Sequence, residues 1–290
     1  VDMYTMLAVP SLIMVPVSWL YAPDVIVTDP PTLASYRTQC WCLLRSKAFF
    51  YIVIYQFFEP FVGRISTPAT VYVKQEWAGV THLNNSMFTV ASLLLFSLGL
   101  YIVRRYYLNA SWVKTIAYTT VALNLTDMVA SFITIYDVWR NQYFYMGETL
   151  VDELPSAMNF VVSTFVIVEM ADDGNEGMTY GLLTTVSNLG TPFSRAISNQ
   201  LFSAFTPDLS DSSNYIQDSR RFRHTVAISY GVSYACAFAS LVFLAFLPHQ
   251  KHDTQIRKHN WPRSNAYAVS TVVMVGIALV YSCIANFMTM

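Results

Sequence analysis

The chain has 290 residues, of which 54% are hydrophobic and only 12% are charged, and its mean hydropathy is +0.39. A soluble domain carries roughly 25% charged residues, so this composition excludes an ordinary soluble protein. The formal net charge of −1 gives no electrostatic basis for binding nucleic acid. The long apolar blocks instead predict an all-α membrane protein, because a transmembrane helix satisfies its own backbone hydrogen bonds inside the bilayer.

Apolar blocks long enough to cross a bilayer recur along the whole chain. Since a helical crossing needs about 20 mostly apolar residues, we expect about eight transmembrane helices. They are placed at 3–22, 47–69, 83–103, 112–135, 151–171, 179–205, 225–247 and 266–288. The connecting segments hold no soluble domain. The chain also starts on Val1, inside an apolar stretch and without an initiator Met, which is typical of the middle of a longer protein.

Lys and Arg are distributed unevenly between the alternating connections, which predicts the orientation of the helices. One set of connections carries Arg37, Arg45, Lys47, Arg104, Arg105, Lys114, Lys251, Arg257, Lys258 and Arg263. The other set carries only Lys74, Arg140, Arg220, Arg221 and Arg223. Basic residues concentrate on the cytoplasmic side of a membrane, so we expect the first set to be cytoplasmic and Val1 to lie outside.

Four charged residues lie inside the expected transmembrane helices and away from their ends: Glu59, Arg64, Asp127 and Arg195. A charge at the centre of a bilayer costs about 2.5–3.5 kcal/mol on insertion scales, so each one needs a partner or a water-filled cavity. These residues therefore indicate either a substrate or proton pathway or ion pairs that hold helices together. Asp127 and Arg195 both lie about 23 Å from the cytoplasmic start of their helices, which predicts an ion pair between them, with Arg64 as the competing base.

Polar side chains also recur at helical spacing on three of the expected helices. The members of these stripes are Thr120, Asn124, Asp127, Ser131 and Thr134; Asn159 and Ser163; and Thr184, Asn188, Thr191, Arg195 and Asn199. Steps of three and four residues place each set on one face of its helix. On the helix at 179–205 the opposite face is apolar. Three polar stripes in one bundle indicate a shared aqueous cavity, although Ser, Thr and Asn also join helices by hydrogen bonds.

No motif in the chain predicts enzyme chemistry. The sequence contains no P-loop, no G-x-S-x-G and no H-E-x-x-H. Its four cysteines lack the spacing of a zinc or redox motif, and the histidines at 249–259 belong to a basic segment that is expected to be solvated. We therefore expect no catalytic residues, no metal site and no cofactor.

Two stretches of the chain combine glycine, acidic and aromatic residues at particular spacings. The first stretch is a turn of Gly174, Asn175, Glu176 and Gly177, followed by Thr179 and Tyr180 and then by Ser187-Asn188-Leu189-Gly190. The second stretch is Asp137, then Phe144-Tyr145-Met146-Gly147-Glu148, with Pro155 opening the next helix. With these two stretches the chain resembles the folate–biopterin transporter family, a branch of the major facilitator superfamily, and the likeness covers about residues 41–247.

The resemblance implies a division of the chain along the pattern of a twelve-helix transporter. Residues 1–22 would be helix six, 23–46 the central cytoplasmic loop, and 47–247 helices seven to twelve. Residues 248–290 would add a basic cytoplasmic loop and one extra helix. The six-helix N-terminal half of the same transporter would then be the missing partner.

The implied function is secondary transport of folates, pterins or related solutes by alternating access, with substrate bound near the midplane. Pathway candidates are Glu59, Arg64, Asn159, Asn188, Arg195 and Asn199, with Arg195 and Asn188 facing the substrate and Glu59 as a candidate proton carrier. Residues with an expected structural role are Asn124, Asp127, Asp137, Gly174 and Glu176. The remaining alternatives are a major facilitator transporter of another solute and a receptor-like multi-span protein.

Overall fold

The computed structural model describes residues 12–18, 20–21, 32–107, 109–171 and 175–288. Nearly all of this part is helical, and none of it forms a strand beyond a single bridge between Ser46 and Arg263. The chain divides into two compact units, Val1–Thr38 and Gln39–Met290. In the first unit residues 12–18 and 20–21 are helical, and the rest of the helix expected at 3–22 lies outside the described residues.

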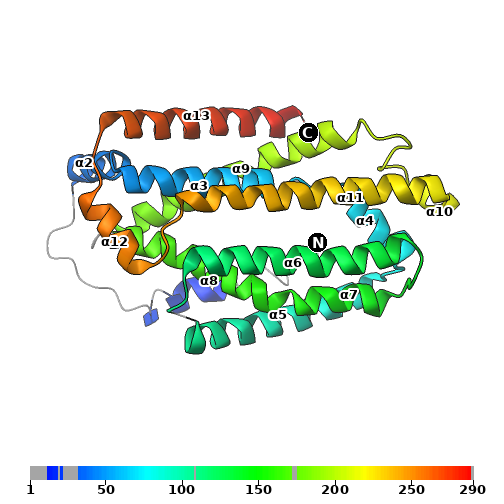
Figure 1. Cartoon of the computed structure of the whole chain (residues 1–290). Helices are drawn as coiled ribbons and strands as arrows, with labels where there is room; N and C mark the ends of the chain where they lie inside the picture. Colours follow the sequence, from blue (N-terminus) through cyan, green and yellow to red (C-terminus); the bar gives the residue numbers. More distant parts are fainter. Residues whose placement is uncertain (1–11, 19, 22–31, 108, 172–174, 289–290) are drawn as a thin grey trace. The chain divides into compact units, whose positions relative to one another are not determined.

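The second unit contains the helices that matter for function (Figure 1). In chain order after α2 (Leu33–Leu44) they are α3 (Lys47–Gly63), α4 (Ala69–Tyr72), the π-helix η1 (Val73–Trp77), α5 (His82–Tyr106), α6 (Trp112–Ile135), α7 (Gln142–Val151), α8 (Glu153–Met170), α9 (Glu176–Phe202), α10 (Ser212–Gln217), α11 (Arg220–Ser240), the 3-10 helix η2 (Leu241–Phe246), α12 (Lys251–Asn260) and α13 (Asn265–Met288).

Five helical segments of the described chain are long and apolar enough to cross a membrane. They are His82–Tyr106, Trp112–Ile135, Gln142–Met170, Arg220–Phe246 and Asn265–Ile284. Each overlaps one of the expected transmembrane helices, although Gln142–Met170 begins well before the helix expected at 151–171. The helices expected at 47–69 and 179–205 correspond to α3, which has only 17 residues, and to α9, which carries the polar stripe. The described part of the chain is therefore nearly all helical, with five helical segments able to span a membrane.

The helix expected at 47–69 is shorter than predicted, because α3 ends at Gly63. Pro60 lies inside its last turns, and Pro68 prevents a simple continuation into α4. Hydroxyl groups accept hydrogen bonds from the freed backbone amides: Ser66 donates to Ser198 Oγ over 3.1 Å, and Thr67 donates to Ser233 Oγ over 3.0 Å. Side chains of α9 and α11 thus stabilise the break, as Ser and Thr do at interruptions of membrane helices.

The main helix–helix contacts of the second unit form two matching sets. Helix α3 packs against α9 and α11, α8 packs against α5 and α6, and α6 packs against α11. Exchanging α3 with α8, α5 with α9 and α6 with α11 reproduces the same set of pairs. Successive long helices run in opposite directions (Figure 1), so the two groups of three helices are related as inverted repeats.

A glycine lies at the equivalent crossing in each group. A Cβ atom at Gly99 of α5 would come within 2.7 Å of the Ala157 Cβ atom on α8. A Cβ atom at Gly190 of α9 would come within 2.8 Å of the Phe57 carbonyl oxygen on α3. Both crossings therefore bring the helix axes close together through a residue without a side chain, as is common in membrane helix packing.

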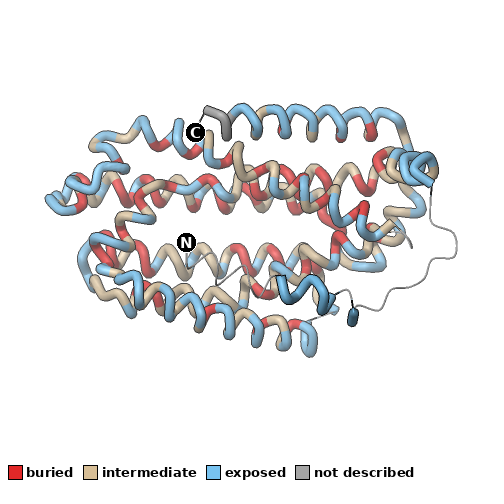
Figure 2. The backbone as a smooth tube through the Cα atoms, turned by 180° about the vertical axis from the view of Figure 1, so that it is seen from behind, coloured by how far each residue is buried: buried red, intermediate tan, exposed pale blue. Residues whose placement is uncertain are grey.

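Large apolar side chains are exposed along several of these helices. On α5 they include Leu83, Met87, Val90, Leu94 and Leu98. Figure 2 shows that α13 is likewise exposed over most of its length. A soluble protein would bury such contiguous apolar surfaces, whereas a membrane protein exposes them to lipid.

The basic segment after residue 248, expected as a loop, contains α12. Its side chains bind the end of α8: Lys251 forms an ion pair of 3.2 Å with Glu169, and Gln255 donates a hydrogen bond to the same carboxylate. Lys258 donates to the carbonyl oxygen of Ala171 over 2.7 Å. The following helix, α13, packs against α9 and α3, so the segment is an integral part of the second unit.

Candidate functional site

The polar stripe of α9 lies on an exposed face of the second unit. Asn188, Arg195 and Asn199 are exposed, and Thr191 is partly buried. The other side of the helix packs into the core through Val186, which is only 3% exposed. Arg195 makes no ion pair or hydrogen bond with any residue that the structure describes. The face therefore carries uncompensated polar groups along much of a long helix.

Arg64 connects the end of α3 to this face. Its Nη1 atom donates a hydrogen bond of 2.8 Å to the Thr191 hydroxyl, one turn before Arg195. Glu59 lies about one turn earlier on α3, is partly buried, and has Arg64 as its nearby positive charge. Two guanidinium groups and one carboxylate are thus grouped around the broken end of α3 and the middle of α9. Such a group suits an anionic solute, because arginine binds carboxylates with several donors in one plane.

Asn199 extends the polar face toward the end of α9. It lines a pocket of about 440 Å³ together with Pro68, Ser203 and Asp208. The pocket joins the residues after the α3 break to the connection between α9 and α10. It is large enough for ordered water and small polar solutes.

Asp127 does not pair with Arg195, so the predicted ion pair is wrong. The carboxylate of Asp127 instead accepts hydrogen bonds from the Tyr234 hydroxyl over 2.9 Å and from the Ser131 hydroxyl over 3.1 Å. Equal depth along two helices does not place two side chains on facing sides. Asp127 points toward α11, whereas Arg195 lies on the exposed face of α9.

The two predicted asparagines of the other stripes make hydrogen bonds within their own helices. Asn124 donates from Nδ2 to the carbonyl oxygen of Thr120 over 2.7 Å. Asn159 accepts from the Ser163 hydroxyl over 3.2 Å. Both are partly buried, and neither is drawn into the group around Arg64 by a hydrogen bond of the described residues.

Asp137 belongs to an ion-pair network at the end of α6. Its carboxylate lies 3.4 Å from Arg140 and 3.2 Å from Arg223, and both arginines also bind Asp218, at 2.7 and 2.6 Å. Burial alone would raise the pKa of Asp218, but the hydrogen bonds and positive charges of Arg140 and Arg223 hold that pKa below its usual value. The network fastens the start of α11 to the connection between α6 and α7.

A second polar cluster, which the sequence did not predict, lies between η1, α6, α7 and α11. Its members are Lys74, Asp127, Tyr145, Glu148, Asp152, Tyr230 and Tyr234. We call it the carboxyl–tyrosine cluster. The local signal that could have revealed it is Asn141, whose side chain accepts hydrogen bonds from the amides of Tyr143 and Phe144 and starts α7 well before residue 151.

Glu176 is the first residue of α9, where a negative charge favours the positive end of the helix dipole. Gly174 lies outside the described residues. Within the described part of the chain, no group of three or more His, Cys, Asp or Glu side chains has the arrangement of a metal site. Comparison with known proteins found no matching family model, no matching curated protein and no matching solved structure.

Proposed function

We propose that this chain is part of a secondary transporter that moves folates, pterins or related anionic solutes across a membrane by alternating access. The observation that carries the proposal is the exposed polar face of α9, which contrasts with the apolar side chains exposed on the long helices α5 and α13. Lipid cannot cover Asn188, Arg195 and Asn199 without a large free-energy cost. The face therefore borders water or a polar partner, as one wall of a solute pathway.

The exchange of α3 with α8, α5 with α9 and α6 with α11 supports the proposal independently of the polar face. Inverted repeats of three helices occur within each half of major facilitator transporters. Under this proposal α3 and α9 also cross the membrane, and the six helices from α3 to η2 form one half of the transporter. The opposite wall of the pathway belongs to a second helical bundle.

The chemistry of the solute follows from Arg195 and Arg64. An arginine in a site of low dielectric constant binds a carboxylate through charge-assisted hydrogen bonds. Folates carry carboxylates and a flat polar ring system, so the solute class suggested by the motifs at 137–155 and 174–190 agrees with these two residues. Another organic anion is the alternative, because the same two arginines would also bind it. A receptor-like protein is less well supported, since signalling does not need an uncompensated arginine on an exposed helix face.

Solute binding tests the proposal. The protein, reconstituted in nanodiscs, should bind radiolabelled folate or pterin, and Arg195→Gln should weaken binding by about 30-fold, because a charge-assisted pair is worth about 2 kcal/mol. Arg195→Lys should recover part of the loss. Arg105→Gln, at the far end of α5, is the matched control and should bind like the wild type. Equal binding by the wild type and Arg195→Gln would reject the proposed site.

A further inference from the structure

Two carboxyl groups lie next to each other inside the protein, one on α7 and one at the boundary between α7 and α8. Glu148 and Asp152 are one helical turn apart, both are partly buried, and each is the other's neighbour. The Oδ1 atom of Asp152 is buried and accepts no hydrogen bond from the described residues. Ionised carboxylates only accept hydrogen bonds, so one of the pair becomes a donor to the other only when it carries a proton.

Charged groups from two further elements act on this pair. Asp127 of α6 adds a third acid, and Lys74 of η1 supplies a positive charge next to Glu148. Glu153, at the start of α8, acts on Asp152. Three acids near one lysine leave the cluster with an excess of negative charge, and bound protons are the simplest way to remove it.

Three buried tyrosines complete the carboxyl–tyrosine cluster. Tyr145 of α7 and Tyr230 and Tyr234 of α11 are 8%, 2% and 5% exposed. The Tyr234 hydroxyl donates to Asp127, whereas the Tyr230 hydroxyl is buried next to Tyr145 and Asp127 and makes no hydrogen bond of ordinary geometry with the described residues. A buried hydroxyl whose neighbouring hydroxyl, here that of Tyr145, is poorly placed for a hydrogen bond is costly. This arrangement of the Tyr230 hydroxyl indicates that the cluster binds a ligand or rearranges when a proton binds.

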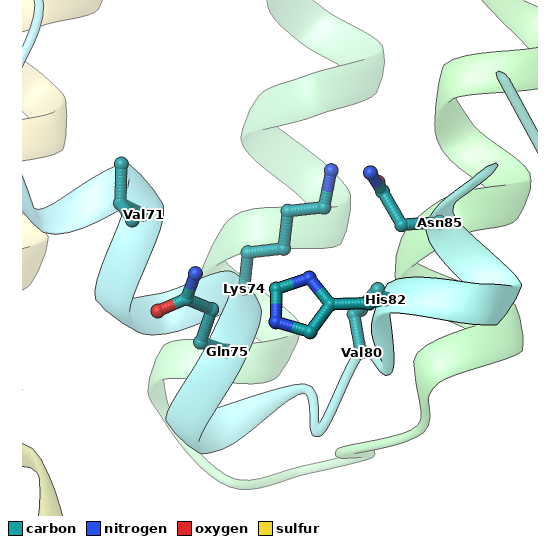
Figure 3. Close-up of a pocket in the computed structure, with 6 residues that line it drawn as sticks. All are labelled: Val71, Lys74, Gln75, Val80, His82 and Asn85. Atoms are coloured by element: carbon teal, nitrogen blue, oxygen red, sulfur yellow. The ribbon is translucent and has the colours of Figure 1, made fainter. Parts of the chain in front are cut away.

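Solvent reaches one side of this cluster through a pocket of about 490 Å³ lined by Lys74, Gln75, His82 and Asn85. Figure 3 shows the side chains of Lys74 from η1 and Asn85 from the start of α5 extending into the same space. Lys74 thus belongs both to the pocket and to the surroundings of Glu148. Glu148 lies about 9 Å along α7 from Gln142, and Asp127 about 12 Å from the end of α6, so the cluster is near this end of the helices.

We propose that the carboxyl–tyrosine cluster is a proton-binding site that couples proton movement to transport. The inference rests on the proposed transport function. A proton entering past Lys74 binds a carboxylate oxygen of Glu148 or Asp152, and the resulting acid donates a hydrogen bond to the other carboxylate. Release returns both groups to carboxylates. The site lies at the contact between α6, α7 and α11, so its charge state affects the packing of both inverted repeats.

The site differs from the proton carrier expected at Glu59. Glu59 has one nearby base and no adjacent acid among the described residues, so it has no second carboxylate with which to share a proton. Glu148 has two acids and one lysine around it and lies next to Tyr145, which in turn neighbours Tyr230. The geometry therefore favours the cluster over Glu59 as the coupling site.

Infrared difference spectroscopy of the purified protein in nanodiscs, recorded while the pH is lowered, tests the inference. We expect a carbonyl band of a buried carboxylic acid that is lost in Glu148→Gln and weakened in Asp152→Asn. Tyr230→Phe should shift the band, because its hydroxyl lies next to Tyr145 and Asp127, which both neighbour Glu148. Glu76→Gln, at an exposed position of η1, is the matched control and should leave the band unchanged.

The outcomes separate this inference from the proposed function. A titrating band that depends on Glu148, in a protein that binds no folate, pterin or other organic anion, would reject the transport proposal and keep the proton site. Solute binding with a band that is absent, or unchanged in both Glu148→Gln and Asp152→Asn, would reject the proton site and keep the transport proposal. If Glu148→Gln does not fold, Asp152→Asn and Tyr230→Phe still decide between these results.

Discussion

Helices α5 and α9 occupy equivalent positions in the two inverted repeats, yet their outward faces are opposite in character. Each crosses its partner through a glycine, Gly99 on α5 and Gly190 on α9. The exposed face of α5 carries apolar side chains such as Leu94, which is 69% exposed. The exposed face of α9 carries Asn188, Arg195 and Asn199. In these two helices, packing against the bundle is therefore independent of the character of the outward face.

This comparison separates structural from functional constraints. The glycines and the apolar inner faces determine how the bundle assembles. The outer face of α5 suits lipid or the apolar surface of a second bundle, whereas the outer face of α9 suits neither. Since both helices need the same inner packing, the polar residues of α9 need a separate explanation, which a solute pathway provides.

The largest expected effect comes from filling the two equivalent crossings. Gly190→Leu should abolish folded protein or destabilise it by about 3 kcal/mol or more, because the new side chain meets the α3 backbone. Gly99→Leu should have a similar effect at the α5–α8 crossing. Gly181→Leu is the control on α9, since nothing lies within 4 Å of its Cβ position. Thermal unfolding in detergent measures all three, and a tolerated Gly190→Leu would contradict the close crossing.

Introducing a charge on each outer face tests the difference between them. Leu94→Arg on α5 should cost about 3 kcal/mol in membrane insertion if that face contacts lipid. Asn188→Arg, at an exposed position of the polar stripe of α9, should cost much less. The fraction of correctly inserted protein in a microsomal translation assay measures both. Equal losses for the two variants would show that α9 faces lipid as α5 does.

The ion pairs between the end of α6 and the start of α11 stabilise the bundle outside the two helices compared above. Asp218→Asn should lower stability at neutral pH by about 2 kcal/mol, because two charge-assisted contacts are lost. Asparagine tolerates the left-handed backbone at this position, where φ is 48°. The pKa of Asp218 is depressed in the folded protein, so its stabilising contribution is present at neutral pH and is lost as the pH falls below about 4.

Unfolding midpoints measured from acidic to neutral pH test this expectation. The wild type and Asp218→Asn should differ at neutral pH and converge at acidic pH. A constant difference across the range would show that the charge of Asp218 is not the source of the stability.

The smallest expected effect is the coupling between Asp127 and Arg195. Because Asp127 binds Tyr234 and Ser131, the stability changes of Asp127→Asn and Arg195→Gln should add to within about 0.5 kcal/mol. Asp127→Asn and Tyr234→Phe should instead be coupled. A double-mutant cycle on thermal stability measures both pairs, and strong coupling of Asp127 with Arg195 would contradict the arrangement of the helices.

Sequence patterns predicted the long helices well and their lateral contacts poorly. The block at 112–135 coincides with α6, because an apolar run has sharp ends where Ser111 and Tyr136 begin the connections. The predicted end of the helix at 47–69 was wrong, since the expected range continues to residue 69 whereas α3 ends at Gly63. Depth along a helix is readable from a sequence, but the direction in which a side chain points relative to other helices is not. For that reason Asp127 was assigned the wrong partner.

The carboxyl–tyrosine cluster was missed for a related reason. Glu148 falls in a segment that hydropathy assigns to a connection, because α7 begins with polar and aromatic residues before its apolar part. Tyr145 and Tyr230 look like ordinary interface aromatics in the sequence. Only the packing of α7 against α6 and of α6 against α11 brings the acids and hydroxyls together.

Accessibility of the α9 face to water is the most direct test of the central claim. In a background lacking the four native cysteines, Asn188→Cys and Asn199→Cys should react with a membrane-impermeant thiol reagent in proteoliposomes. Leu94→Cys on α5 and Ile228→Cys on α11, 69% and 59% exposed, should react slowly. Added folate should slow the reaction of Asn188→Cys. Equal, slow labelling of all four positions would place the α9 face in lipid and contradict the pathway.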